Sequence, residues 1–267
     1  MRMKLNRLLL LGALIATLGT LRAQDIHYSL YNMSPLTLNP ALTGAYEGTA
    51  RIGGIYRDQW ASFLPNQFTT PSFFIDAPII RGFRKTDWVG VGMVTVNDKA
   101  GSAKLKTTMN MLSLSYHYAL DKDRKTMLTL GIQGGSVQRS LDNEELIFGD
   151  AIQSGQPTEE VNFEETSYLD FAAGLMLRSQ ISDISKLEVG LAFNHITQPK
   201  KASFQANPTS DDNRPMKIAV HSTFNSQLTD KLSIAPTVLF QTTGGATETA
   251  LQAWGGYIIK EENPAEK

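Results

Sequence analysis

Histidine is the side chain best suited to metal binding and acid–base chemistry near neutral pH, and this chain has four. They are His27, His117, His195 and His221, separated by long stretches of chain. Neither HExxH nor HxH spacing occurs, so no two histidines are placed to hold a metal from one local element. The sequence therefore predicts no metal site.

Acidic residues gather in one predicted loop, where their chemistry would be weak cation binding. Paired glutamates at 144–145, 159–160 and 164–165 accompany Asp142 and Asp150. The D-x-D-x-D-G spacing of a calcium loop is missing. We expect these charges to be solvated, and weak binding of Ca²⁺ or of lipopolysaccharide-bridging cations is the alternative.

Other catalytic and nucleotide-binding patterns are also missing. Gly90-Val91-Gly92 lacks the third glycine of a dinucleotide loop and lies in an alternating stretch. The sequence has no Gly-x-Ser-x-Gly elbow and no phosphate-binding loop of the G-x-x-x-x-G-K-[ST] type, and it has no cysteine. We therefore predict a protein that is not an enzyme and uses no cofactor or nucleotide.

The net charge and the N-terminal residues further limit the classes of protein to which this chain can belong. The formal net charge is −1, which gives no basic surplus for binding nucleic acid. Residues 1–23 have a basic start, an apolar run and a small-residue end, as in a Sec-type signal peptide. No later apolar run reaches the roughly 20 residues of a membrane-spanning helix. If the exported chain enters a membrane, we expect it to do so as a β-barrel, and retention of residues 1–21 as an anchor is the alternative.

Apolar and polar residues alternate with period two through most of the chain after Lys106. In 111–118, leucine and tyrosine take the even positions, while Ser113, Ser115 and His117 take the odd ones. Period two indicates β-strands with two different faces. One face is apolar and the other is polar or small. His117 and His221 fall on the polar face, where we expect them to line an interior.

About ten strands follow from this pattern, each long enough to cross a bilayer when tilted. They are expected at 49–58, 67–77, 87–97, 106–118, 126–139, 166–180, 186–196, 215–226, 231–242 and 248–259. Short turns are expected at 121–125, 182–186 and 229–231, and longer loops at 97–105, 139–166, 196–215 and 242–247.

Short turns at one end and longer loops at the other are typical of outer-membrane barrels. The sequence therefore predicts an all-β, antiparallel, up-and-down transmembrane β-barrel over 49–259. A secreted β-sandwich also alternates and is the alternative.

The most specific pattern begins the predicted mature chain. Its pieces are Gln24, Asp25 and Tyr28 in an aromatic-rich stretch, Asn39, Pro40 and Gly44 in an N-P-A-x-x-G turn, and Arg57, Gln59 and Trp60 after a strand. These pieces and their order resemble the PorP/SprF family of the Bacteroidetes type IX secretion system. The resemblance runs from Gln24 to about Ile259.

The motif residues have a physical interpretation as well. Asn39-Pro40 favours turn initiation, and Gly44 can adopt a positive φ before the first strand. We expect residues 24–48 to form a periplasmic or plug segment seated against the barrel, with direct contact to a ligand or partner as the alternative. Arg57, Gln59 and Trp60 are expected at the outer rim, with Trp60 as an interfacial aromatic.

Residues 260–267 form a polar tail that contains Pro264. Such a tail does not suit a closing, lipid-facing strand. The resemblance implies barrels with more strands, so we expect this chain to be shortened at its C-terminus relative to the family.

The resemblance implies an outer-membrane component that assists secretion or surface attachment of large adhesins, including those of gliding motility. Its partners would be lipid, a secreted adhesin and other type IX subunits. The alternative function is a porin or FadL-like transporter of small or hydrophobic solutes. A transporter would act alone in a bilayer, whereas a secretion component would depend on its partners.

Overall fold

The computed structural model describes residues 28–60, 62, 68–81, 84–101, 105–141, 165–199 and 213–259. The predicted signal peptide, Gln24, Asp25 and the 260–267 tail lie outside these residues. So do the glutamate pairs at 144–145 and 159–160 in the predicted acidic loop.

The described residues contain ten strands in one antiparallel sheet, and each strand pairs with the next along the chain. The strands are β1 (Arg51–Gln59), β2 (Phe68–Arg81), β3 (Trp88–Ala100), β4 (Leu105–Ala119), β5 (Thr126–Ser140), β6 (Thr166–Ser182), β7 (Ser185–Asn194), β8 (Lys217–Gln227), β9 (Leu232–Thr243) and β10 (Ala246–Tyr257). The predicted up-and-down sheet is confirmed.

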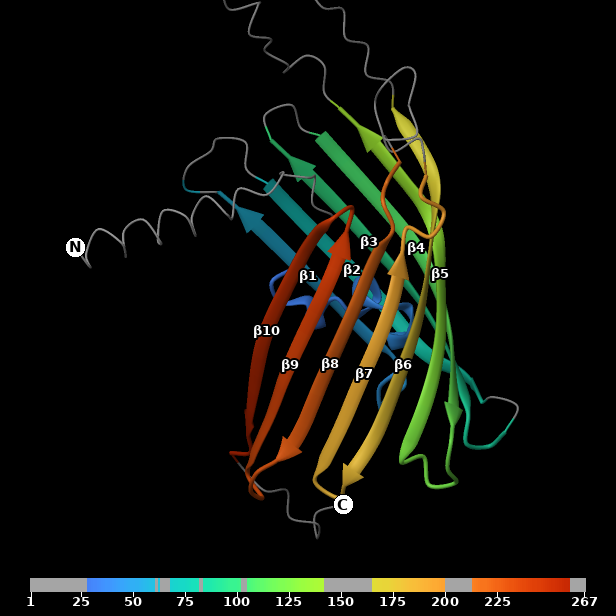
Figure 1. The fold of residues 1–267 in the computed structure, drawn as a ribbon, viewed down its shortest axis with the longest axis vertical. Coiled ribbons are helices and arrows are strands. Elements are labelled where there is room, and N and C mark those ends of the chain that lie inside the picture. Colours follow the sequence, from blue (N-terminus) through green and yellow to red (C-terminus); the bar gives the residue numbers. More distant parts are fainter. Residues whose placement is uncertain are drawn as a thin grey trace, which may run out of the picture.

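The sheet curls into a half-barrel (Figure 1). β1 and β10 are its two edges, and within the described part of the chain no further strand pairs with either edge. A β-sandwich needs two sheets packed face to face. The described strands form one sheet, so the sandwich alternative is wrong.

Two predicted loops are shorter than expected. The connection at 242–247 is a tight hairpin in which Gly244 and Gly245 separate β9 from β10. Both glycines have positive φ, at 54° and 87°, as a two-residue hairpin turn requires. The connection at 97–105 is also shorter, because β3 continues to Ala100 and β4 begins at Leu105. The prediction of longer loops at these two places was wrong.

The two faces of the sheet differ in a way that reverses the arrangement of a water-soluble protein. On β4, Leu112 and Leu114 on the outer face are 67% and 46% exposed, whereas Ser113 and Ser115 on the inner face are 4% and 2% exposed. Membrane barrels show this arrangement because their outer face meets lipid. The predicted division into an apolar and a polar face is therefore confirmed.

The described residues that precede β1 lie within the curve of the sheet. We call residues 28–50 the inner segment. It contains η1 (Tyr31–Met33), α2 (Pro35–Leu38) and η2 (Pro40–Leu42), which lie inside the half-barrel in Figure 1. Among the described residues, no helix has the length and apolar composition to span a membrane.

The apolar core lies between the inner segment and the inner face. Leu36 is fully buried against Phe74, Val94, Val96 and Met111 of β2 to β4. Tyr31 and Leu38 pack on the opposite wall, against Ala192, Ala219 and Leu239 of β7 to β9. The inner segment therefore connects the two walls of the half-barrel.

Candidate functional site: the inner segment and the inner face

Asn39 begins the turn that the sequence singled out. Its backbone is extended, with φ −154° and ψ 121°, as expected for a residue before proline. Its side-chain oxygen accepts a hydrogen bond from the Ala41 amide at 2.9 Å, which caps η2. The turn therefore forms locally from the Asn-Pro-Ala sequence.

The amide nitrogen of Asn39 connects this turn to three strands. Nδ2 lies 3.3 Å from the Leu175 carbonyl of β6 and 3.4 Å from the Leu191 carbonyl of β7. It also lies 3.0 Å from Nε2 of His221 on β8. Because Nδ2 can only donate, His221 accepts through Nε2 and is neutral in this arrangement. One fully buried side chain thus holds the turn against β6, β7 and β8.

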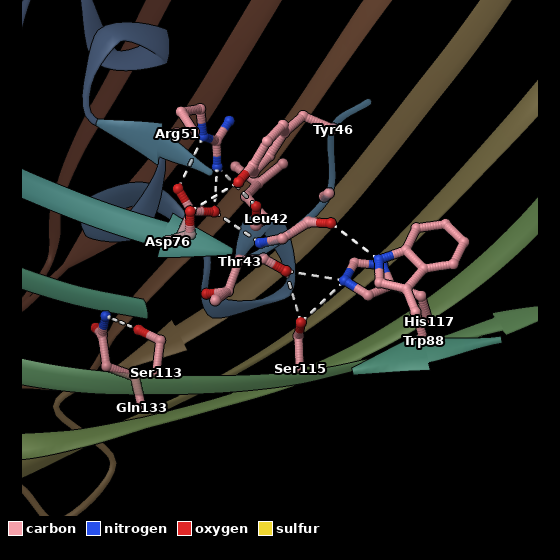
Figure 2. A network of polar contacts seen from close by, with 12 residues as sticks. Leu42, Thr43, Tyr46, Arg51, Asp76, Trp88, Ser113, Ser115, His117 and Gln133 are labelled. Atoms are coloured by element: carbon pink, nitrogen blue, oxygen red, sulfur yellow. Dashed lines mark hydrogen bonds and ion pairs between the residues drawn. The ribbon is translucent and has the colours of Figure 1, made fainter. Parts of the chain in front are cut away.

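The carbonyl of Thr43 makes the corresponding contact with β4 (Figure 2). It accepts from Nε2 of His117 at 2.8 Å and from the Ser115 hydroxyl at 2.6 Å. Nδ1 of His117 lies 2.9 Å from the Thr129 hydroxyl, so both ring nitrogens are used. Trp88 stacks on the imidazole with the ring centroids 4.5 Å apart, which fixes its orientation.

Gly44 completes the turn against β2 and β3. Its φ is 64°, the positive value that its place in the motif suggested. Its amide donates to a carboxylate oxygen of Asp76 at 2.6 Å, and its carbonyl accepts from the Trp88 indole at 2.9 Å. A Cβ at this position would lie 2.8 Å from Gly90 Cα. Both the conformation and the space therefore require glycine.

Asp76 and Arg51 form the ion pair beside this turn (Figure 2). Arg51 donates to both carboxylate oxygens, at 2.9 and 2.8 Å, and to the Leu42 carbonyl at 3.0 Å. Asp76 is 2% exposed and stands in an otherwise apolar stretch of β2. Because a buried carboxylate needs such partners, the pair fixes the end of the inner segment where β1 begins.

Small residues shape the inner face to the turn. An added Cβ at Gly131 would overlap the backbone of Pro40 and Ala41, and one at Gly174 would overlap the Asn39 side chain. At Gly190 the overlap would be with His221. Glycine within a strand often marks a close approach by another backbone, and here that backbone is the inner segment.

The remaining described motif residues are Tyr28, Arg57, Gln59 and Trp60, and the structure brings only some of them together. Tyr28 is buried, and burial raises the pKa of its hydroxyl to about 12. Arg57 lies close enough to oppose this shift electrostatically, and it donates to the side chain of Gln59. Trp60 leaves the strand with φ 65° and is 60% exposed. The described motif residues therefore divide into those within the half-barrel and Trp60 at its surface.

Asp87 forms a separate polar cluster at the start of β3. Arg84 donates to both of its carboxylate oxygens, at 3.0 and 2.9 Å, and the Tyr116 hydroxyl and the Ala119 amide donate as well. These donors, Arg84 first, hold the pKa of the Asp87 carboxyl well below its usual range. The cluster fastens the β2–β3 connection to the end of β4.

Several interior contacts could not be assigned from the sequence. The residues concerned are Asp76, Trp88, Ser115, Thr129 and Gln133, whose partners on the inner segment or on adjacent strands are distant in sequence. One available signal was Asp76, a charge inside the apolar run of β2. His117 and His221 face the interior as predicted.

A cavity of about 1390 Å³ opens beside the inner segment at the end of the short turns. Its lining combines residues 45–49 with strand ends and turns, and includes four basic and four acidic residues. The charged residues are Glu47, Asp123, Arg124, Lys125, Arg178, Asp183, Lys186 and Glu188. Arg178 and Glu188 pair at 2.7 Å, and Arg178 also donates to the Ala45 carbonyl. The lining therefore has little net preference for anions or cations.

A second buried pair lies near the other end of the strands. Nδ1 of His195 lies 2.5 Å from a carboxylate oxygen of Asp170, whose other oxygen accepts from the Phe171 amide. Within the part of the chain that the structure describes, no group of three or more His, Asp or Glu side chains is arranged to hold a metal. The pair fastens the residue after β7 to β6.

The family model described as "Type IX secretion system membrane protein PorP/SprF" matches residues 20–257. No curated protein matches the chain.

Two solved structures are similar in fold at low identity. An anion-selective porin from Comamonas acidovorans has 8% identity and a TM-score of 0.35, with 79% of this chain and 54% of the porin covered. The translocator domain of the autotransporter NalP from Neisseria meningitidis has 8% identity and a TM-score of 0.37, with 79% of this chain and 86% of that domain covered. The chain thus spans about half the length of the porin.

The family match includes both the inner segment and all ten strands. It also includes the N-P-A-x-x-G turn and the Arg57, Gln59 and Trp60 positions on which the resemblance depended. Because this range covers nearly the whole chain, the protein belongs to the PorP/SprF family of type IX secretion system membrane proteins.

Proposed function

We propose that this protein is a non-enzymatic outer-membrane component of the type IX secretion system. It assists the secretion or surface attachment of large adhesins, including proteins of gliding motility. It is exported by the signal peptide at 1–23, and the inner segment acts as its plug. In this role the protein binds partners and is not itself an open conduit.

The observation that carries this proposal is the occupation of the half-barrel by the chain's own inner segment. Leu36 and Ala41 have no exposed surface, and Asn39 is equally buried. Hydrogen bonds from β2 to β8 hold the turn at both ends. A segment bound in this way occupies that part of the interior. This arrangement favours a binding role over conduction.

The outer face supports placement in the outer membrane. Leu130, Ile132 and Leu169 are each about 60% exposed, at 60%, 61% and 63%. Large apolar side chains exposed in a row along strands are unfavourable in water and favourable against lipid. Strands alternating in this way are the form in which bacterial outer membranes accommodate proteins.

Contacts with partners have two accessible places in this proposal. One is the cavity at the short-turn end, which corresponds to the periplasmic side in barrels of this topology. The other is the opposite rim, where Trp60 is exposed. A periplasmic secretion subunit would reach the first, and a secreted adhesin at the cell surface would reach the second.

A transporter of small or hydrophobic solutes is the second candidate. The cavity of about 1390 Å³ is the observation that favours it, because this space is large enough to hold a small molecule, whose sites commonly occupy about 300–1,000 Å³. The two functions differ in whether the protein acts alone. A transporter conducts or binds solute by itself in a bilayer, whereas a secretion component does not.

The deciding experiment is affinity purification of tagged full-length protein from outer membranes of its native cell, followed by mass spectrometry. An unrelated tagged outer-membrane barrel is the control. Recovery of type IX subunits or a large secreted protein, specific to this bait, supports the proposal. Recovery of the protein alone, together with solute-dependent conductance in planar bilayers, would establish the transporter instead.

A further inference from the structure

Apart from its apolar packing, the inner face contacts the inner segment through hydrogen bonds that go mainly to the segment's backbone. Side chains of the sheet bond the carbonyls of Leu36, Thr43, Gly44 and Ala45 and the amide of Gly44. The donors and the acceptor come from five strands, β2 to β6. They are Gln133, His117, Ser115, Trp88, Arg178 and Asp76. Recognition of backbone groups by positioned side chains is how proteins bind extended peptides and turns.

Two positions add sequence selectivity to this recognition. Asn39 supplies the donor to Leu175, Leu191 and His221. Its side chain lies against Gly174, where an added Cβ would overlap it. Gly44 is required by its positive φ and by the proximity of Gly90. A peptide that fits this surface therefore needs asparagine and glycine five residues apart, with a turn between them.

The covalent connection between this turn and β1 is short and exposed. Residues 47–50 are all exposed, whereas Thr43, Gly44 and Ala45 before them are buried. The bonds that hold the turn to β2–β8 do not run through that connection. The turn is in this sense a ligand joined to its site by a linker.

We propose that the inner face is a peptide-binding site for an Asn-Pro-Ala-x-x-Gly turn, and that the inner segment is its resident peptide. The same turn supplied as a separate peptide binds at the same place. This inference is independent of the proposed role in secretion, because it concerns only the site and the peptide.

The test uses the full mature chain with residues 47–50 replaced by a protease recognition sequence. The protein is folded in detergent micelles, cleaved, and passed over a size-exclusion column. A fluorescent synthetic peptide of residues 28–46 is then added in excess, and its incorporation is followed over time. Heat-dependent gel mobility before and after cleavage reports whether the sheet remains folded.

We expect the cleaved segment to elute with the sheet and the labelled peptide to exchange into the site. An Asn39→Ala peptide should compete about tenfold or more weakly, because it lacks the buried donor. A Thr37→Ala peptide is the matched control and should compete normally, since within the described part of the chain that hydroxyl donates to the segment's own Ser34 carbonyl and not to the sheet.

Equal competition by the Asn39→Ala peptide would overturn the proposal. So would failure of the labelled peptide to enter a cleaved sheet that stays folded. Loss of folded sheet on cleavage would equally overturn it, because the segment would then be part of the fold and not a bound peptide. The pull-down result for the secretion role changes none of these outcomes.

Discussion

The inner and outer faces of the same strands follow opposite rules. On β5, Gln133 is buried and bonded to the Leu36 carbonyl and to Ser113, whereas the adjacent Ile132 is 61% exposed. Polar groups are inside because the chain's own inner segment satisfies them. Apolar groups are outside because the surrounding medium is lipid. The comparison teaches that one alternating strand is adapted to two different environments. Its inner face contacts a peptide segment, and its outer face contacts the bilayer.

The strongest way to break the inner face is to fill the space reserved for the inner segment. Gly131→Val places a branched side chain against the backbone of Pro40 and Ala41. We expect the unfolding free energy in micelles to fall by about 3 kcal/mol, the upper part of the usual range for overpacking.

Gly255→Val is the matched control, because nothing lies within 4 Å of an added Cβ at that strand position. Denaturant titration of both variants measures the difference. Equal stability of Gly131→Val and Gly255→Val would mean that the inner segment does not occupy this face.

The outer face is tested by charge. Ile132→Arg should lower stability in a bilayer by about 2–4 kcal/mol, because an arginine near the midplane of the lipid face is costly. At a position 61% exposed to water the same change would have little effect. Folding titrations into lipid vesicles give the value.

Gln138→Arg on the same strand and face, nearer its end, is the control and should cost about 0–1 kcal/mol. If both arginines are tolerated equally, the outer face is not in contact with hydrocarbon.

Asn39→Ala tests the hydrogen bonds by which the inner face recognises its segment. Removing the side chain leaves the Leu175 and Leu191 carbonyls and His221 without their shared donor. We expect a loss of about 1–3 kcal/mol, the usual consequence of leaving buried polar groups unpaired. Thr37→Ala should cost less than about 1 kcal/mol, and a similar cost for both would remove the special role of Asn39.

The smallest effect concerns pH. The depressed pKa of Asp87 means that its charged form stabilises the folded state. This contribution is complete above the unfolded-state pKa of about 4 and is lost as the pH falls below it. Stability should therefore decrease on acidification, and Asp87→Asn should make that decrease shallower. Asp230→Asn in an exposed turn is the control; an unchanged acid profile for Asp87→Asn would contradict the assignment.

Much of the fold was predictable because alternation is a local signal. Residues 111–118 alone indicate which side chains of β4 face inward, and ten such stretches give the strand count. The hairpin at Gly244-Gly245 was missed because a glycine pair suits both a tight turn and a loop.

Only one part of the candidate site was predictable from the sequence, the turn whose residues are close together in the chain. Asn39, Pro40 and Gly44 predict a turn. The residue before a proline is restricted to extended backbone, and glycine is the residue that most readily adopts a positive φ. The partners of that turn are far away in sequence, such as Asp76 on β2 and His221 on β8. Nothing in the local pattern states which inward residue meets which carbonyl, so those contacts required the fold.

The most direct test of the central claim compares adjacent residues on β4 in reconstituted bilayers. The chain has no cysteine, so Ser113→Cys and Leu114→Cys each introduce a single thiol. The account predicts that a fluorophore on residue 114 is quenched by a lipid-confined quencher, and that residue 113 resists a water-soluble maleimide. If residue 113 reacts as fast as a cysteine at exposed Glu47, the interior is open to water and the account is wrong.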